Sequence, residues 1–227
     1  MKNIKTTAII PAAGNGTRMG RTESKLFLML GDMPVLAHTL RAFERAENVD
    51  EIIIAAREED ILLIWDMVSE FQIPKVSKII NGGANRTESV YAALREVSDD
   101  TKLVAIHDGA RPLIKPKLID FAIAEAARKN AVTLGVKVKD TIKRVGANGV
   151  IAETLERDSL YHIQTPQVFR TDIIFKAYET AINRGLDYTD DCGLVEDLGV
   201  AVHIIEGDYK NIKITTAEDL IIAEGLL

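Results

Sequence analysis

Short apolar runs alternate with amphipathic segments along most of the chain, beginning close to its first residue. The apolar runs that predict strands are Thr7 to Pro11, Glu51 to Ala56, Ser77 to Ile80, Leu103 to His107 and Val132 to Val138. The amphipathic segments, with apolar residues at helical spacing, predict helices over 34–46, 60–71, 86–97 and 116–129. Such alternation is typical of a mainly parallel sheet with helices on both faces. We therefore predict a doubly wound, Rossmann-like α/β fold.

The pattern changes after Val138. Two short β-rich pieces, 140–145 and 150–155, flank the sequence GANG, which is typical of a hairpin turn. This inserted β-hairpin is too small to form a core of its own, so it should project as an arm at about 139–157. The alternation then resumes with a helix over 171–184, a strand near 200–205 and a final helix from Thr216. We expect one domain over residues 1–227, with the β-arm attached.

Composition limits the partners and the compartment. The formal net charge is −6 and the Lys and Arg residues are scattered, which argues against a nucleic-acid surface. The apolar runs fall far short of the roughly 20 residues that span a bilayer, and the N-terminus has no signal-peptide pattern, so we expect a cytoplasmic protein without membrane contact. Cys192 is the only cysteine, which excludes an intrachain disulfide and favours an inert thiol.

The strongest local signal is the glycine-rich stretch PAAGNGTRMG, residues 11–20, directly after the first predicted strand. In open α/β sheets ligands bind beyond the carboxyl ends of strands. Gly14 and Gly16 would let successive N–H groups approach phosphates there. The third glycine comes one residue too late for the dinucleotide fingerprint, and the Walker A pattern is missing. The stretch contains one cation, Arg18, and a second, Lys25, follows it. These two charges favour a phosphate-binding loop over a simple turn.

Two further segments place polar residues at predicted strand ends. In the first, residues 105–112, Asp108 suits Mg²⁺, which takes one or two carboxylates and completes its shell with water and substrate phosphates. A helix-capping aspartate is the alternative. His107 is interpreted as a hydrogen-bonded structural histidine. The chain has no pair of histidines at metal-ligand spacing, which disfavours a zinc hydrolase. In the second, residues 81–89, paired glycines would permit contact with a flat base and Ser89 could donate a hydrogen bond; a turn with a helix cap is the alternative.

Additional motifs follow in order: Asp140-Thr141-x-Lys143, Arg157, Gln164-Thr165-Pro166-Gln167, Thr189-Asp190-Asp191 and Asn211-Ile212-Lys213. Together with the three segments above, this series resembles the 2-C-methyl-D-erythritol 4-phosphate cytidylyltransferase family over essentially the whole chain. The sequence departs from the family pattern at Leu26, at Ala84, where an acidic residue is common, and at Cys192-Gly193. None of these changes removes a charge that the chemistry needs, although Ala84 bears on base and ribose recognition.

The resemblance implies a single nucleotidyltransferase domain that transfers CMP from CTP to 2-C-methyl-D-erythritol 4-phosphate, forming 4-diphosphocytidyl-2-C-methyl-D-erythritol and pyrophosphate in non-mevalonate isoprenoid precursor biosynthesis. It implies Mg²⁺ as cofactor, with Asp108 at the metal. It also implies catalytic cations around the triphosphate, namely Arg18, Lys25 and Lys213. The implied nucleotide-binding residues are Pro11, Ala12, Ala13, Gly14, Gly16, Gly82, Gly83 and Ser89. The implied acceptor-binding residues are Arg111, Thr141, Arg157, Thr165 and Thr189.

In the family that the chain resembles, hairpin arms pack in a homodimer and carry acceptor-binding residues to the partner's site. The chemistry itself needs no general base, because a phosphate monoester has a second pKa near 6 and is largely dianionic at pH 7. Catalysis would then rest on positioning and on cations that neutralise the charge at the α-phosphate.

Three alternatives stay open from sequence alone. A ribitol 5-phosphate cytidylyltransferase would share the motifs and the chemistry. A non-catalytic nucleotide-binding regulator could keep the glycine-rich loop, but it would not need Lys25, Asp108 and Arg157 together. A dinucleotide-dependent dehydrogenase is disfavoured by the displaced third glycine.

Overall fold

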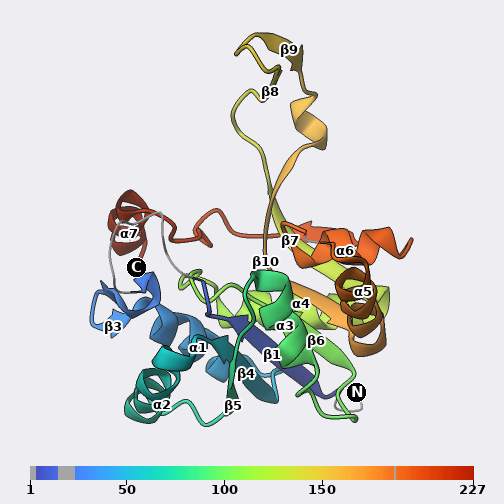
Figure 1. Cartoon of the computed structure of the whole chain (residues 1–227). Coiled ribbons are helices and arrows are strands. Elements are labelled where there is room, and N and C mark those ends of the chain that lie inside the picture. Colours follow the sequence, from blue (N-terminus) through green and yellow to red (C-terminus); the bar gives the residue numbers. More distant parts are fainter. Residues whose placement is uncertain (1–3, 15–23, 187) are drawn as a thin grey trace.

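The computed structural model describes residues 4–14, 24–186 and 188–227. Within these ranges, seven strands form one sheet in the order β11-β7-β10-β6-β1-β4-β5 (Figure 1). β10 runs antiparallel to its neighbours β6 and β7, whereas the other neighbouring strands are parallel. The seven strands are β1 (Thr6–Pro11), β4 (Glu51–Ala56), β5 (Val76–Asn81), β6 (Leu103–Ile106), β7 (Ala131–Lys137), β10 (Tyr161–Arg170) and β11 (His203–Glu206). The predicted doubly wound, mainly parallel α/β fold is confirmed.

Helices cover both faces of this sheet, as its buried strands require. One face packs against α1 (Val35–Arg45), α2 (Ile61–Glu70), α4 (Pro116–Lys129) and α7 (Ala217–Glu224). The other packs against α3 (Arg86–Leu94), α5 (Thr171–Arg184) and α6 (Asp191–Asp197). In β1, Ala8 and Ile10 join the first core and Ile9 joins the second, because successive strand side chains point to opposite faces. All three are fully buried. No described helix has the length and apolar character needed to cross a membrane.

The sequence prediction missed β10 and α6. Pro166 lies within β10 and lacks the N–H that a central strand uses, which is why the segment does not read as a strand. The structure places this proline at an irregularity: the register between β10 and β7 shifts between Ile163 and Gln167, and the Thr165–Pro166 peptide bond is cis. Two small strands, β2 (Met29–Leu30) and β3 (Met33–Pro34), form a separate hairpin that was also unpredicted.

The inserted arm leaves the sheet between β7 and β10 (Figure 1). Its strands β8 (Lys143–Val145) and β9 (Ile151–Thr154) pair antiparallel, and every residue in them is exposed. The base of the arm is held by Tyr209, whose hydroxyl donates to the Lys137 carbonyl at 2.8 Å. The Lys139 ammonium lies 3.7 Å from the centre of the same ring, a cation–π contact. The arm therefore starts from a fixed root on the sheet.

Because no residue in 139–159 belongs to the described core, we expect the sheet to fold without the arm. Val138 and Leu160 already face each other, with the Val138 N–H donating to the Leu160 carbonyl at 3.1 Å. Replacing 139–159 by Asn-Gly, a two-residue hairpin turn, should leave cooperative unfolding and a Tm within about 5 °C of the parent protein. Thermal unfolding followed by circular dichroism measures this. Loss of the cooperative transition would show that the arm is part of the folding unit.

Candidate active site

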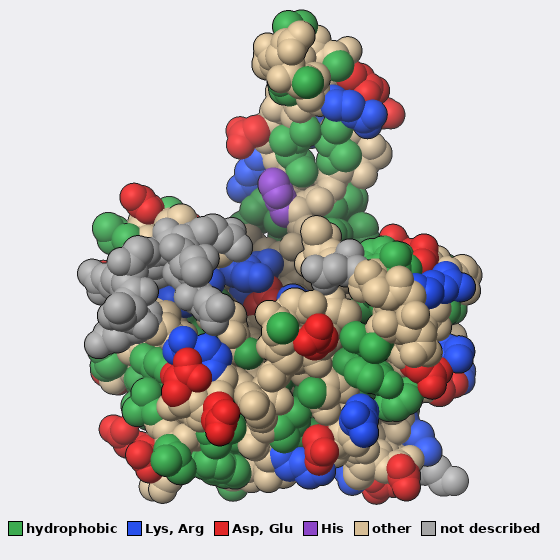
Figure 2. Space-filling model, viewed as in Figure 1, with side chains coloured by type: hydrophobic (Ala, Val, Ile, Leu, Met, Phe, Trp, Pro, Cys, Tyr) green, Lys and Arg blue, Asp and Glu red, His purple; other side chains and the backbone are tan. Residues whose placement is uncertain are grey.

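The loops that follow the parallel strands β1, β5 and β6 meet at one edge of the sheet. The chain order along the sheet reverses at β1, which lies between β4 on one side and β6 on the other, and such a reversal is where open α/β sheets bind ligands. Backbone pairing continues past the strand ends: the Ala12 N–H donates to Ala55 at 2.7 Å, and the Gly82 N–H donates to Ala56 at 2.7 Å. In the space-filling view the surface is hollowed below the arm, with charged side chains visible inside the hollow (Figure 2).

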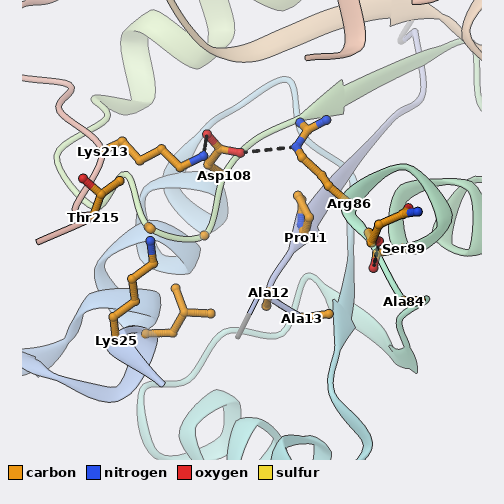
Figure 3. A pocket seen from close by; sticks show the side chains of 15 residues that line it. Pro11, Ala12, Ala13, Lys25, Ala84, Arg86, Ser89, Asp108, Lys213 and Thr215 are labelled. Carbon is orange, nitrogen blue, oxygen red and sulfur yellow. Dashed lines mark hydrogen bonds and ion pairs between the residues drawn. The ribbon is translucent and has the colours of Figure 1, made fainter. Parts of the chain in front are cut away.

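The first cavity, of about 330 Å³, lies among these loops (Figure 3). Five of the residues predicted to bind nucleotide line it: Pro11, Ala12, Ala13, Gly14 and Ser89. Three charged residues from the sequence analysis line it as well: Lys25, Asp108 and Lys213. Gly16 and Arg18, the other predicted members of the glycine-rich loop, lie outside the described residues. The cavity thus has one wall of small residues and one charged wall, which is formed by Arg86, Asp108 and Lys213.

The loop between β5 and α3 forms part of the small-residue wall, and side chains of α3 hold it in place. The Ser89 hydroxyl donates to the Asn85 carbonyl at 2.7 Å and accepts from the Gly83 N–H at 3.1 Å. Glu88 accepts from the Ala84 N–H at 2.8 Å. A Cβ on Gly82 would lie 2.7 Å from the Ala13 Cβ, so close packing of the two loops requires glycine there. Ser89 therefore shapes the loop, and its proton is already used on the backbone.

Asp108 is the centre of the charged wall. Its side chain is 11% exposed, and it lies 2.9 Å from the Lys213 ammonium, 3.4 Å from Arg111 Nε and 3.7 Å from Arg86 Nε. Figure 3 shows Lys213 and Arg86 reaching it from opposite sides. Burial alone would raise the pKa of Asp108, but the charges of these three cations hold that pKa well below its usual range. The carboxylate therefore stays ionised and keeps three cations together.

Arg86 was part of a motif in the sequence analysis but was not predicted as a site residue. It forms two hydrogen bonds of 2.7 Å with the carboxylate of Asp191, which is fully buried and also accepts from the Tyr178 hydroxyl. The Gln167 side-chain oxygen accepts from the Asp191 N–H at 2.9 Å and so fixes the start of α6. An arginine that opens a helix after a Gly-Gly loop was the available signal, but its acidic partner lies 105 positions away.

A second cavity, of about 310 Å³, adjoins the charged wall. It shares Arg86, Asp108 and Lys213 with the first cavity. Three of the residues predicted to bind the acceptor line it: Arg111, Thr165 and Thr189. The other two, Thr141 and Arg157, are exposed on the arm and line neither cavity as the described residues define them. The Arg157 guanidinium instead donates to the Lys139 carbonyl at 3.1 Å.

The structure shows where each of the three departures from the family pattern lies. Leu26 and Ala84 line the first cavity. Cys192 is buried in α6, where burial raises the pKa of its thiol and leaves it unreactive. A Cβ on Gly193 would lie 2.9 Å from the Tyr188 ring, which accounts for a glycine there. Among the described residues, no cluster of three or more His, Cys, Asp or Glu side chains could hold a metal ion by itself.

A model of the family described as 2-C-methyl-D-erythritol 4-phosphate cytidylyltransferase matches residues 6–227. The chain belongs to this family. A protein of that name from Bacillus cytotoxicus is 45% identical over 221 residues, which is 97% of each chain. One from Desulforamulus reducens is 42% identical over 228 residues, covering 100% of this chain and 97% of the relative.

Solved structures support the same family. The 4-diphosphocytidyl-2C-methyl-D-erythritol synthase of Anaerococcus prevotii superimposes with a TM-score of 0.87 at 33% identity, covering 99% of this chain and 96% of that one. The cytidylyltransferase of Thermus thermophilus gives a TM-score of 0.78 at 30% identity, with 96% of each chain covered. The enzyme is therefore a cytidylyltransferase. The dehydrogenase, regulator and ribitol 5-phosphate alternatives receive no support from these similarities.

The pairing of Arg86 with Asp191 predicts how this cytidylyltransferase responds to loss of one charge. Asp191→Asn leaves a largely buried guanidinium without its main opposite charge, and breaking a buried pair in this way costs about 3 kcal/mol of unfolding free energy or more. Glu196→Gln, at an exposed position of the same helix, is the matched control and should change stability by less than about 0.5 kcal/mol. Urea unfolding of both variants measures the difference. Equal small losses would mean that the Arg86–Asp191 pair does not hold this wall.

Proposed function

We propose that this cytidylyltransferase transfers CMP from CTP to 2-C-methyl-D-erythritol 4-phosphate, giving 4-diphosphocytidyl-2-C-methyl-D-erythritol and pyrophosphate in non-mevalonate isoprenoid precursor biosynthesis. One observation carries the residue assignment: two cavities share a wall made of Arg86, Asp108 and Lys213. A reaction that joins two anionic substrates needs two adjacent sites with cations between them. This arrangement supplies both.

The first cavity is assigned to CTP. Its small residues, on the loops after β1 and β5, let a flat base and ribose approach the backbone. Lys25 and Lys213 line the same cavity and would contact the triphosphate. Arg18 is assigned there on family resemblance alone, since it lies outside the described residues.

The second cavity is assigned to the sugar-alcohol phosphate. Arg111 and Lys213 line it and can bind the phosphate, while Thr189, exposed at its rim, can bind a hydroxyl. Gln164, Gln167 and Asp190 add further polar atoms to the lining. An acceptor with one phosphate and several hydroxyls matches this mixture of cations and neutral polar groups.

The chemistry follows from charge. An oxygen of the dianionic acceptor phosphate attacks the α-phosphorus of CTP, a new P–O bond forms, and the bond from the α-phosphorus to the bridging oxygen breaks as pyrophosphate leaves. No side chain has to take a proton. His107, the nearest histidine in sequence to the charged wall, is fully buried, and burial lowers its pKa to about 4. Lys213 and Arg86, common to both cavities, would neutralise the charge that builds between the substrates.

Mg²⁺ is the proposed cofactor, and among the described residues Asp108 is placed to bind it. Asp108 is the only carboxylate common to both cavities among the described residues, and its Oδ1 has an ion pair only at 3.7 Å. Mg²⁺ usually takes one or two carboxylates and completes its shell with phosphates and water, so Asp108 and the triphosphate would hold it together. When bound, the ion would supply charge neutralisation at the phosphates.

Lys213 gives the direct test. With CTP and Mg²⁺, the wild-type enzyme should release pyrophosphate with 2-C-methyl-D-erythritol 4-phosphate and not with ribitol 5-phosphate. Lys213→Ala should lower turnover at least about a hundredfold, the usual loss of one charge-stabilising group. Lys210→Ala, on the same loop but exposed and outside both cavities, should stay near the wild-type rate. A rate for Lys213→Ala equal to that of Lys210→Ala would contradict the assignment.

We also propose that the sheet and its arm act as one nucleotidyltransferase domain and that two copies form a homodimer through the arms, in the cytoplasm where CTP is available. The arm carries exposed apolar side chains: Val145 is 52% exposed, Val150 68% and Ile151 58%. Thr141 and Arg157 line neither cavity of their own chain as described. A partner's arm could bring them to the second cavity, which makes the acceptor site a shared one.

Subunit exchange tests this sharing. Lys213→Ala and Arg157→Ala are each expected to be inactive as pure dimers. If Arg157 serves the partner's cavity, one site in each mixed dimer has both residues intact, and random pairing restores about a quarter of the wild-type sites. Pyrophosphate release before and after exchange measures this, with native mass spectrometry to verify that mixed dimers form. No recovery after verified exchange would show that Arg157 does not act across the dimer.

A further inference from the structure

A chain of hydrogen bonds runs behind the charged wall and joins the end of β6 to β10. The Asp108 N–H donates to the Thr165 hydroxyl oxygen at 3.1 Å. The same oxygen lies 3.0 Å from His107 Nδ1, and His107 Nε2 lies 3.2 Å from the Arg111 carbonyl oxygen. His107 is fully buried, Thr165 is 5% exposed and Asp108 is 8% exposed. The chain therefore lies in the interior, between the core and the second cavity.

The direction of every bond in this chain is determined by its two ends. The Arg111 carbonyl can only accept, so His107 Nε2 carries the proton and donates it. The ring is fully buried and its two nitrogens contact a hydroxyl and a backbone carbonyl, neither of which carries a charge, so the neutral ring is favoured and Nδ1 is an acceptor. The Thr165 hydroxyl accepts from the Asp108 N–H, so its single proton goes to His107 Nδ1. Thr165 has no proton left for a ligand.

We propose that His107 is a positioning residue for the proposed reaction, acting through Thr165 to fix the backbone that carries Asp108 and Arg111. This inference rests on the function proposed above. It also changes the role of Thr165: its hydroxyl holds the Asp108 backbone and does not donate to the acceptor phosphate. The ring of Phe43, centred 5.0 Å from that of His107, forms an apolar side of the same site.

The segment held in this way controls much of the charged wall. Asp108 and Arg111 lie at its two ends, and the Arg111 guanidinium donates to the Asn211 carbonyl at 2.9 Å, two positions before Lys213. A shift of the segment would therefore move Asp108 and Arg111, which both line the second cavity. Displacements of about 1 Å in groups that position substrates can cost a hundredfold in rate.

A double-mutant cycle tests the proposal. Thr165→Val removes the hydroxyl with little change in volume, and His107→Phe removes both ring nitrogens. Each should lower kcat/KM for the acceptor about tenfold or more, the effect of one buried hydrogen bond, with the KM for CTP within about twofold. The double variant should lose no more than the worse single variant, because both act through one chain. Additive losses would overturn the proposal, since they would mean that Thr165 contacts the acceptor independently of His107.

Conservative variants separate positioning from loss of folding. Thr165→Ser keeps the hydroxyl and should recover most of the kcat/KM that Thr165→Val loses. His107→Asn places an amide oxygen near the Nδ1 position and should keep more activity than His107→Gln, whose amide nitrogen lies near the Nε2 position. His203→Gln, at an exposed position of the edge strand β11, is the control and should match the wild type. The reverse order of the Asn and Gln variants, or wild-type kinetics for His107→Phe, would overturn the proposal.

The ring tautomer gives a readout that does not depend on catalysis. Nitrogen-15 spectra of the wild type should show His107 as the neutral Nε2–H tautomer, and Thr165→Val should shift its Nδ1 signal by removing the donor. The histidine is assigned by comparison with His107→Asn. A neutral Nδ1–H tautomer would overturn the hydrogen-bond direction. Absence of turnover in a wild type that shows the Nε2–H tautomer would instead contradict the proposed function and leave the network standing.

Discussion

One buried carboxylate holds this active site together. Asp108 lies at the carboxyl end of β6 and keeps Arg86, Arg111 and Lys213 within 3.7 Å, although they come from three separate parts of the chain. Three cations so close together would repel one another, and a buried carboxylate without partners would be strongly destabilising. Each compensates for the other. The result is a cluster of cations already in place between two cavities, where the two anionic substrates of the proposed reaction would meet.

The reversed strand β10 supplies the second half of this arrangement. Gln164, Thr165 and Gln167 are buried on it, which is unusual for polar residues in a central strand. Each is used: Thr165 contacts the Asp108 N–H, and Gln167 accepts from the first N–H groups of α6, which carries Asp191. Gln164 donates to the Asp208 carbonyl, on the loop that leads to Lys213. The polar residues of β10 therefore connect the three charged segments that surround Asp108.

Unlike the rest of the described chain, the arm adds no residue to the buried core. Its strands bury nothing within their own subunit, so its position depends on the root, where Tyr209 contacts Lys137 and Lys139. Tyr209 belongs to the same loop as Lys213. The anchor of the arm and Lys213, the proposed catalytic cation, thus lie on one loop. The two acceptor residues predicted on the arm, Thr141 and Arg157, have their proposed place in a partner's cavity for the same reason.

Apolar periodicity is a local property, so the alternating strands and helices could be predicted from the sequence. Asp108 was predicted because it follows a predicted strand, Lys25 because it follows the glycine-rich stretch, and Lys213 through the resemblance to the family. The sequence did not reveal β10, whose proline and buried polar residues make sense only beside its neighbours. It also missed the pairing of Arg86 with Asp191, the wall between two cavities and the direction of the bonds at His107. Two of the contacts on which they depend, Asp108 with Thr165 and Arg86 with Asp191, join residues 57 and 105 positions apart, which only the packed sheet brings together.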